Sequence, residues 1–260
     1  MRSALVSLGL MAALPLCAQD LGRHWYLDVH QVKPTMEGHY EGLQDGKAFR
    51  MDLVNDLALQ KDKTKLGVGL EYQGPRFGFE LSSAEQDYVG VATVALGKVV
   101  QINGQTWNGG ARISTFLKSR TSTVNWTIRA LKWPRFWMGL DLGARGIGID
   151  LVANGVEPIS GVKAQAIEKD TLPVPQIGPS LGFNAFNGRV VARGFYHFLS
   201  YKGSSYHHVG GDVRFFPLSW VGVRAFVDNE EFKVPKGSIR DDLEIGLTRN
   251  GSGLGVVLRF

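Results

Sequence analysis

The chain has 260 residues and a formal net charge of +5; charged residues make up 20% of it, and glycine alone contributes 33 residues. The positive charge is small and spread along the chain, which excludes the concentrated basic surface of a nucleic-acid-binding protein. After residue 20 there is no run of about 18 consecutive apolar residues, which excludes a helical membrane protein.

The N-terminus has the pattern of a secretory signal peptide. Arg2 supplies a positive start, an apolar run rich in small residues follows, and a cleavage site is available after Ala18. We therefore expect residues 1–18 to be removed on export and residues 19–260 to form a single domain.

The single cysteine, Cys17, leaves one alternative open. A lipoprotein signal ends at a modified cysteine that follows a small residue, but here the bulky Leu16 precedes it. If cleavage follows Ala18, the mature chain has no cysteine, so disulfides and thiol chemistry play no part.

The rest of the chain alternates large apolar residues with small or polar ones, which is the period of a β-strand. Short connections that include an Asn-Gly pair separate many of these segments. Ten strands are predicted, at residues 24–32, 66–73, 76–86, 111–130, 135–149, 172–186, 189–201, 206–216, 219–230 and 250–260.

Long polar stretches alternate with the short turns and are interpreted as loops; they cover residues 33–48, 86–110, 151–171 and 228–242. Two further segments, 49–59 and 243–248, also alternate, and Asn250-Gly251-Ser252 resembles a tight turn. We assign both segments to strand extensions above the membrane. If both crossed the membrane, the count would be twelve.

The polar face of the predicted strands is rich in glycine, with scattered arginine and glutamate. A soluble sandwich would instead expose long polar side chains such as lysine. Small residues beside a few long charged ones suit a narrow, crowded lumen. The sequence therefore predicts an all-β protein, a single closed antiparallel transmembrane β-barrel of about 10 strands, with a range of 8 to 12.

The C-terminus carries the most specific pattern. Gly255 is followed three residues later by the apolar Leu258 and two further on by the terminal Phe260. This resembles the C-terminal signal of bacterial outer-membrane β-barrels, although Gly253 stands where that signal has a polar residue. The resemblance implies recognition by the barrel assembly machinery.

More broadly, the chain resembles small, uncharacterised members of the outer-membrane β-barrel superfamily. The resemblance covers nearly all of the mature chain and rests on pattern more than on a sharp motif. It implies the outer membrane of a Gram-negative cell as the location, and membrane lipid and lipopolysaccharide as partners. The oligomeric state stays open.

A cluster around two adjacent histidines is the most suggestive candidate for a catalytic or metal site. His207 and His208 follow Ser204 and Ser205, and Asp212 lies nearby. Lipid-deacylating barrels carry a His-x-Ser element, which this chain lacks. Adjacent histidines on a strand point to opposite faces, which argues against joint chelation. We therefore predict no catalytic, cofactor-binding or metal residue, no cofactor, and that the chain is not an enzyme.

The inward faces of the strands carry charges that need partners away from bulk water. We predict an arginine–carboxylate network that plugs the lumen. The predicted lumen-lining charges are Arg129, Arg193, Arg214, Arg224, Glu71, Glu80, Glu244 and Arg259; Arg112, Arg145, Asp141 and Asp212 fit the same alternation.

The expected function is a structural or surface-interaction role for a barrel whose polar lumen is largely plugged. Two alternatives stay open: a narrow porin-like channel for small solutes, and an outer-membrane enzyme that modifies lipids.

Overall fold

The structure is a computed structural model that describes residues 23–44, 47–102, 105–156, 161, 163–236 and 244–260. The predicted signal peptide and the alternative at Cys17 lie outside these residues. No helix in the described ranges is long and apolar enough to cross a membrane.

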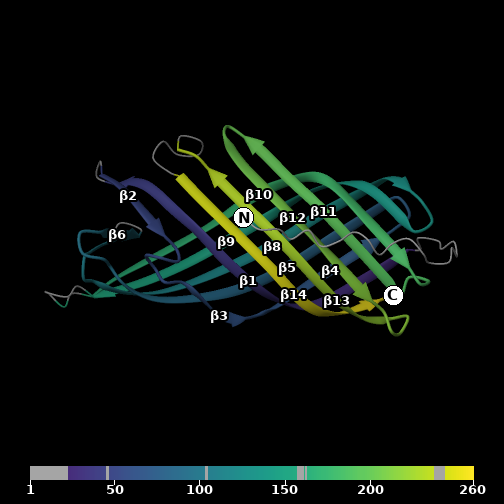
Figure 1. The fold of residues 1–260 in the computed structure, drawn as a ribbon, viewed down its shortest axis with the longest axis horizontal. Coiled ribbons are helices and arrows are strands. Elements are labelled where there is room, and N and C mark those ends of the chain that lie inside the picture. Colours follow the sequence, from purple (N-terminus) through teal and green to yellow (C-terminus); the bar gives the residue numbers. More distant parts are fainter. Residues whose placement is uncertain (1–22, 45–46, 103–104, 157–160, 162, 237–243) are drawn as a thin grey trace, which may run out of the picture.

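Strands neighbouring in sequence pair antiparallel and form a closed ring, and β14 pairs with β1 to complete it (Figure 1). The ring consists of β1 (His24–Gln44), β4 (Leu66–Gln73), β5 (Phe77–Thr93), β8 (Arg112–Lys132), β9 (Phe136–Val156), β10 (Lys163–Ala185), β11 (Val190–Tyr201), β12 (Ser204–Phe215), β13 (Val221–Val234) and β14 (Glu244–Arg259). The predicted all-β antiparallel barrel of about 10 strands is confirmed.

The two ends of the barrel differ. Four short turns, near residues 74–76, 133–135, 186–189 and 216–220, lie at one end, which we call the turn end. At the predicted Asn-Gly turn, Asn187 and Gly188 adopt φ values of 58° and 70°, which glycine and asparagine tolerate best. The opposite, distal end carries the smaller strands (Figure 1).

Much of what was predicted as long loops is strand. β1 runs on to Gln44, β5 to Thr93 and β9 to Val156, and β10 already begins at Lys163. The ladder continues because backbone hydrogen bonding does not depend on side-chain polarity, so polar outward residues mark only where the strands leave an apolar environment. The tight turn expected at residues 250–252 is wrong for the same reason, since this segment continues β14.

The smaller strands are not among the ten that close the ring. β2 (Lys47–Asp52) pairs with the distal part of β1, and β3 (Gln60–Thr64) pairs with β5. β6 (Val99–Ile102) and β7 (Gln105–Asn108) form a separate hairpin. The alternative of twelve crossing strands is therefore wrong.

An apolar core fills the distal end of the ring from within. Trp107 of the β6–β7 hairpin is fully buried and lies so close to Gly155 of β9 that a Cβ atom there would overlap the indole. The backbone at Leu57, which follows β2, approaches Gly90 of β5 in the same way. Both glycines are inward-facing, so the hairpin and the segment around Leu57 fold into the barrel.

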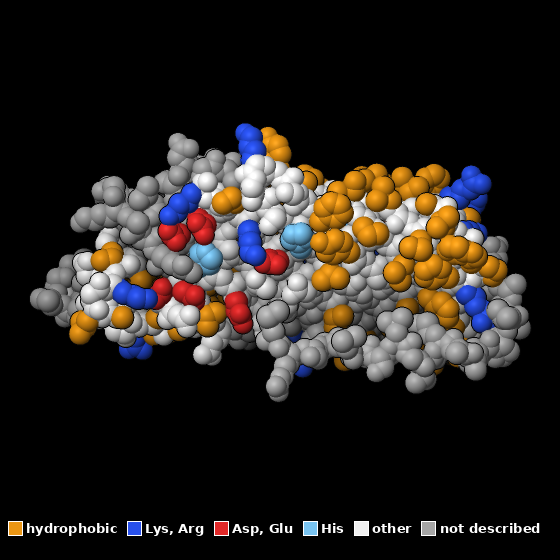
Figure 2. Space-filling view, turned by 45° about the horizontal axis from the view of Figure 1, so that its top comes forward, with side chains coloured by type: hydrophobic (Ala, Val, Ile, Leu, Met, Phe, Trp, Pro, Cys, Tyr) orange, Lys and Arg blue, Asp and Glu red, His pale blue; other side chains and the backbone are white. Residues whose placement is uncertain are grey.

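The outer surface divides into two zones. Near the turn end the outward side chains form a continuous apolar belt that includes Leu27, Trp126, Leu140, Val213 and Val256, each at least 40% exposed (Figure 2). Outward residues beyond the belt include Lys33, Glu85, Lys118, Arg120, Asp150 and Lys169. Such a belt matches the apolar band of barrels that cross a lipid bilayer.

The belt makes a prediction about charge. Changing Leu27 to Arg should lower the free energy of unfolding in lipid vesicles by about 2–4 kcal/mol, because the guanidinium would lie in hydrocarbon. Thr35→Arg, on the same face of β1 but beyond the belt, should change it by no more than about 0.5 kcal/mol. Denaturant titration of both variants measures the free energy of unfolding. Equal losses in the two variants would show that the belt does not mark the position of the hydrocarbon.

Candidate functional site in the barrel lumen

Arg193 of β11 lies at the centre of a charged network inside the ring. Its Nη1 donates a hydrogen bond to Glu80 of β5 at 2.6 Å, and its Nη2 donates to Asp141 of β9 at 2.9 Å. Its Nη1 also lies 3.9 Å from Glu71 of β4. One guanidinium thus joins four strands around the ring.

Arg214 and Arg224 extend this network to the remaining side of the lumen. Arg214 donates to Asp212 at 2.6 Å and to Glu71. Arg224 donates to Asp28 of β1 at 3.1 Å and lies 3.4 Å from Asp212. The network therefore runs continuously from Asp141 of β9 to Asp28 of β1 across the interior. Such pairs tolerate burial only when each charge keeps its partners.

Asp141 shows how completely one member is satisfied. Its side chain is fully buried, and it accepts hydrogen bonds from Thr127 and Ser180 at 2.7 Å each in addition to the bond from Arg193. His197 Nε2 lies 3.0 Å from the same carboxylate. A buried carboxylate needs this number of donors, because it has lost all its hydration.

A second charged cluster lies nearer the distal end. Arg145 and Arg249 both pair with Glu230, and the Arg145 Nε–Glu230 Oε1 distance is 2.9 Å. Tyr206 donates to Glu230 at 2.8 Å, and Gln176 donates to the Tyr206 hydroxyl at 2.9 Å. This cluster adds another set of contacts across the lumen.

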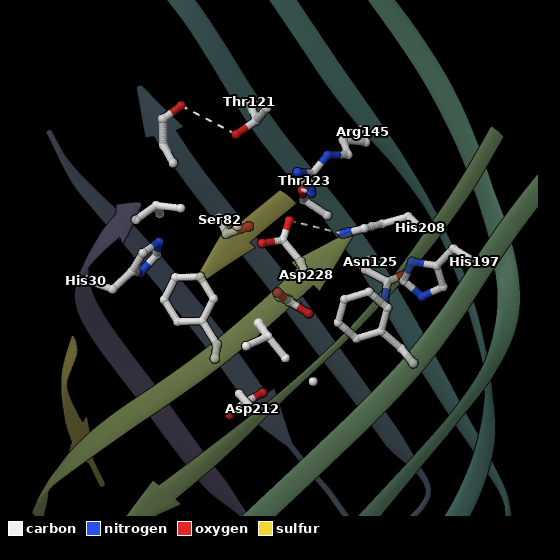
Figure 3. Close-up of a pocket in the computed structure, with 18 of the residues that line it drawn as sticks. His30, Ser82, Thr121, Thr123, Asn125, Arg145, His197, His208, Asp212 and Asp228 are labelled. Atoms are coloured by element: carbon white, nitrogen blue, oxygen red, sulfur yellow. Dashed lines mark hydrogen bonds and ion pairs between the residues drawn. The ribbon is translucent and has the colours of Figure 1, made fainter. Parts of the chain in front are cut away.

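Between the two sets of ion pairs lies a cavity of about 110 Å³ (Figure 3). Three histidines line it, and each has a carboxylate partner. The nitrogen–oxygen distances are 2.5 Å for His30–Asp28, 3.0 Å for His197–Asp141 and 3.6 Å for His208–Asp228. Ser82, Asn125 and Asp212 also line the cavity, with Phe195 and Phe226.

The structure distributes the predicted lumen charges among three places. Five of them form the central network: Arg193, Arg214, Arg224, Glu71 and Glu80. Arg129 and Arg259 cap the turn end, where they donate to the carbonyl oxygens of Gly74 at 2.7 Å and Gly188 at 2.6 Å. Each guanidinium also lies over an aromatic ring, that of Trp137 or Phe216.

Glu244 is placed differently from the prediction. The inward residues of β14 have odd numbers, as buried Arg249 and Val257 show, so Glu244 faces outward. Its carboxylate lies 3.6 Å from His39 on the outer surface. The sequence predicts a turn at residues 250–252, but β14 runs through them without a break. The inward and outward positions before residue 250 were therefore assigned to the wrong faces.

The sequence-based prediction left out several lumen residues, among them Asp28, His30, Glu230 and Arg249. For the first two the signal was readable, because Tyr26, Asp28 and His30 alternate with outward Trp25, Leu27 and Val29. Glu230 and Arg249 fell in segments that were interpreted as a loop and the approach to a turn.

The C-terminal residues occupy both faces of β14. Gly255 faces the lumen against His30, where a Cβ atom would be crowded. Leu258 and Phe260 face outward, with Phe260 66% exposed, and Phe260 pairs with Trp25 through backbone hydrogen bonds. Recognition of these residues by the assembly machinery stays a prediction.

The histidines at 207 and 208 point to opposite faces, as expected from the strand period. His207 is outward and bonds to the Tyr196 hydroxyl at 2.7 Å, whereas His208 lines the lumen cavity. In the described part of the chain no histidine forms a hydrogen bond with a serine, the pairing expected of a lipid-deacylating barrel. Nor do these residues include a group of three or more potential metal ligands.

Beyond the belt, Glu85 anchors an outward cluster of charges. Lys65 donates to it, and Arg120 donates to it at 2.8 Å. These two hydrogen bonds lower the pKa of Glu85 to about 2, and the bond to Glu85 raises the pKa of Lys65. The cluster joins β5 and β8 with the residue that precedes β4.

No protein-family model and no curated protein matches the sequence. Among solved structures, the outer-membrane protease OmpT of Escherichia coli is similar with a TM-score of 0.60 and 9% identity, over 91% of this chain and 97% of that one. The translocator domain of the autotransporter NalP from Neisseria meningitidis gives a TM-score of 0.42 at 10% identity, over 93% and 90%. Ail of Yersinia pestis gives 0.30 at 13%, over 92% and 99%.

The first of these similarities corrects one prediction. The sequence predicts that the chain is not an enzyme, but an outer-membrane protease has the same fold over nearly the whole chain. The prediction that the chain is not an enzyme is therefore wrong, because this fold accommodates catalysis.

Removing Arg193 should destabilise the barrel strongly. Arg193→Met leaves the buried carboxylate of Asp141 and the partly exposed carboxylate of Glu80 without this cation, so the free energy of unfolding should fall by about 3–5 kcal/mol. Arg76→Met, at an exposed position in a turn, should change it by no more than about 0.5 kcal/mol. Denaturant unfolding in vesicles compares the two, and equally small effects would show that the network contributes little.

The Glu85 cluster predicts a dependence on pH. Because the pKa of Glu85 falls from 4.5 to about 2 on folding, its stabilisation is present above pH 4.5 and is lost as the pH falls through about 2. Glu85→Gln should therefore lower the unfolding midpoint at neutral pH, and the difference from wild type should vanish near pH 2. Glu37→Gln, at an exposed site on β1, is the control; a Glu85 difference independent of pH would contradict the assignment.

Proposed function

We propose that this chain, which has the fold of the bacterial outer-membrane β-barrels, is a non-conducting barrel of the outer membrane that holds a rigid platform for surface interactions beyond the lipid. The observation that carries the proposal is the continuous ion-pair network from Asp141 to Asp28 across the lumen. A solute passing through would have to break pairs that are buried on both sides.

An apolar core forms a second barrier that closes the lumen. At the distal end the lumen holds an apolar core that includes Trp107 of the inward hairpin, Leu57 of the segment after β2, and Ile113 and Leu151 of the ring strands. Most side chains there are apolar, so water and ions would find few polar partners. A solute would therefore meet two barriers of different chemistry, one charged and one apolar.

The surface role rests on the strand extensions. The ladder of β8 and β9 continues from Lys118–Asp150 to Arg112–Val156, well beyond the apolar belt. Extended, paired strands filled by an apolar core form a rigid structure, unlike a long loop. We infer that this distal part presents fixed side chains to the cell exterior.

The belt and the charges next to it support lipid as a partner. Lys118, Arg120 and Lys169 lie on outward faces just beyond the belt, where the phosphate groups of lipopolysaccharide or phospholipid would lie. Export by the N-terminal signal and recognition of Leu258 and Phe260 by the assembly machinery belong to the same proposal.

Single-channel recording tests the closure. The refolded protein in a planar bilayer should give no open steps, whereas a porin in the same membrane gives the positive control. A variant that changes Glu71, Asp212, Arg193 and Arg214 to serine and replaces residues 97–109 by a short linker should conduct, because both barriers are then weakened. Reproducible open steps from the wild-type protein would overturn the proposal in favour of a narrow channel.

A further inference from the structure

The lumen cavity contains polar atoms that the protein leaves without partners. Asn125 of β8 is only 1% exposed, yet neither its amide nitrogen nor its amide oxygen forms a hydrogen bond with any described residue. Gln176 Oε1, His197 Nδ1 and His208 Nδ1 are unpaired in the same way. All four residues line the cavity, and Figure 3 labels Asn125, His197 and His208. Unmade hydrogen bonds at buried groups are costly, so these atoms indicate an occupant.

The charges around the cavity are already satisfied by the protein. Glu80 is paired with Arg193, Asp212 with Arg214, and Arg224 with Asp28. Arg145 and Arg249 are paired with Glu230, and Asp228 lies beside His208. Every one of these charges is therefore ion-paired within the protein, although the Nε atoms of Arg145 and Arg224 form no hydrogen bond. The other open positions belong to amide and imidazole groups.

Those open positions include both donors and acceptors. The Asn125 amide nitrogen donates, whereas its amide oxygen and Gln176 Oε1 accept, and each histidine Nδ1 does one or the other according to its tautomer. A hydroxyl group donates one hydrogen bond and accepts two, so it satisfies either kind of partner.

Aromatic rings complete the lining. Phe195 stacks on His197 with ring centroids 4.7 Å apart, and Phe226 meets His30 edge-on at 5.1 Å. The two phenylalanines thus place apolar surface beside the polar groups, which is the usual composition of a small-molecule site. Glu80 and Asp228 keep 24% and 18% of their side chains exposed, so solvent in the lumen reaches the site.

We propose that this cavity binds a small, neutral, hydroxyl-rich molecule, a polyol or a single sugar. The cavity volume of about 110 Å³ exceeds the space that one water needs, since about 10–15 Å³ holds one. Asn125 is the principal recognition residue, because its amide supplies a donor and an acceptor that no described residue engages. This site goes beyond the proposed platform role and does not depend on whether the lumen conducts.

The test uses the full refolded protein in detergent micelles, with glycerol and D-glucose as probes and ligand-detected NMR titration as the measurement. Saturable binding with a Kd of about 1 mM is expected. Asn125→Leu should weaken it roughly tenfold through lost hydrogen bonds. Ala84→Leu, which fills the cavity from β5, should weaken it at least as much.

Asn184→Leu is the matched control, because Asn184 lies near the turn end of β10 and does not line the cavity. Binding lost in both cavity variants and kept in the control supports the proposal; if Asn125→Leu fails to fold, Ala84→Leu alone decides. The absence of saturable binding would mean that the cavity holds only water and would overturn the proposal. Equal competition by glycine or acetate would overturn the assigned ligand class, and unchanged binding in the cavity variants would overturn the site.

Discussion

The pairing of β14 with β1 is the constraint on which the rest of the structure depends. Sixteen residue pairs join the two ends of the sheet, from Tyr26–Arg259 to Glu41–Glu244. A sheet in lipid cannot leave an open edge, because no water is present to satisfy the free backbone groups. Once the ring is closed, every strand has one face toward the exterior and one toward a narrow interior. Closure of the ring therefore places the apolar belt on the exterior and the charged network in the interior.

Most of the fold was predictable because the signals are local. Period-two alternation placed all ten ring strands, and the residues at Asn187-Gly188 set the turn between two of them. The lengths of the strands were not predictable in the same way, since a strand that leaves lipid keeps its ladder and loses only its apolar outward residues. β5 and β9 therefore looked like strands followed by loops.

The site could be predicted only in part. Alternation was enough to place Arg193, Arg214 and Glu71 in the lumen, and the need to pair buried charges predicted that they would meet. Alternation placed Glu244 on the wrong face of its strand. The turn predicted at residues 250–252 shifted the expected register of the residues before it. The folding of Trp107 into the ring and the unpaired state of Asn125 had no sequence signal at all, since each depends on distances between strands that only the closed barrel sets.

The spacing of the network along the chain has a consequence for the order of folding. Arg193 and Glu80 are separated by 113 residues, Arg214 and Glu71 by 143, and Arg224 and Asp28 by 196. None of these contacts can form early, because closing such long stretches of chain costs entropy before any contact repays it. We therefore expect Arg224, whose partner Asp28 lies on β1, to stay hydrated until β1 pairs with β14. The water around this guanidinium would then leave in the same event that closes the ring.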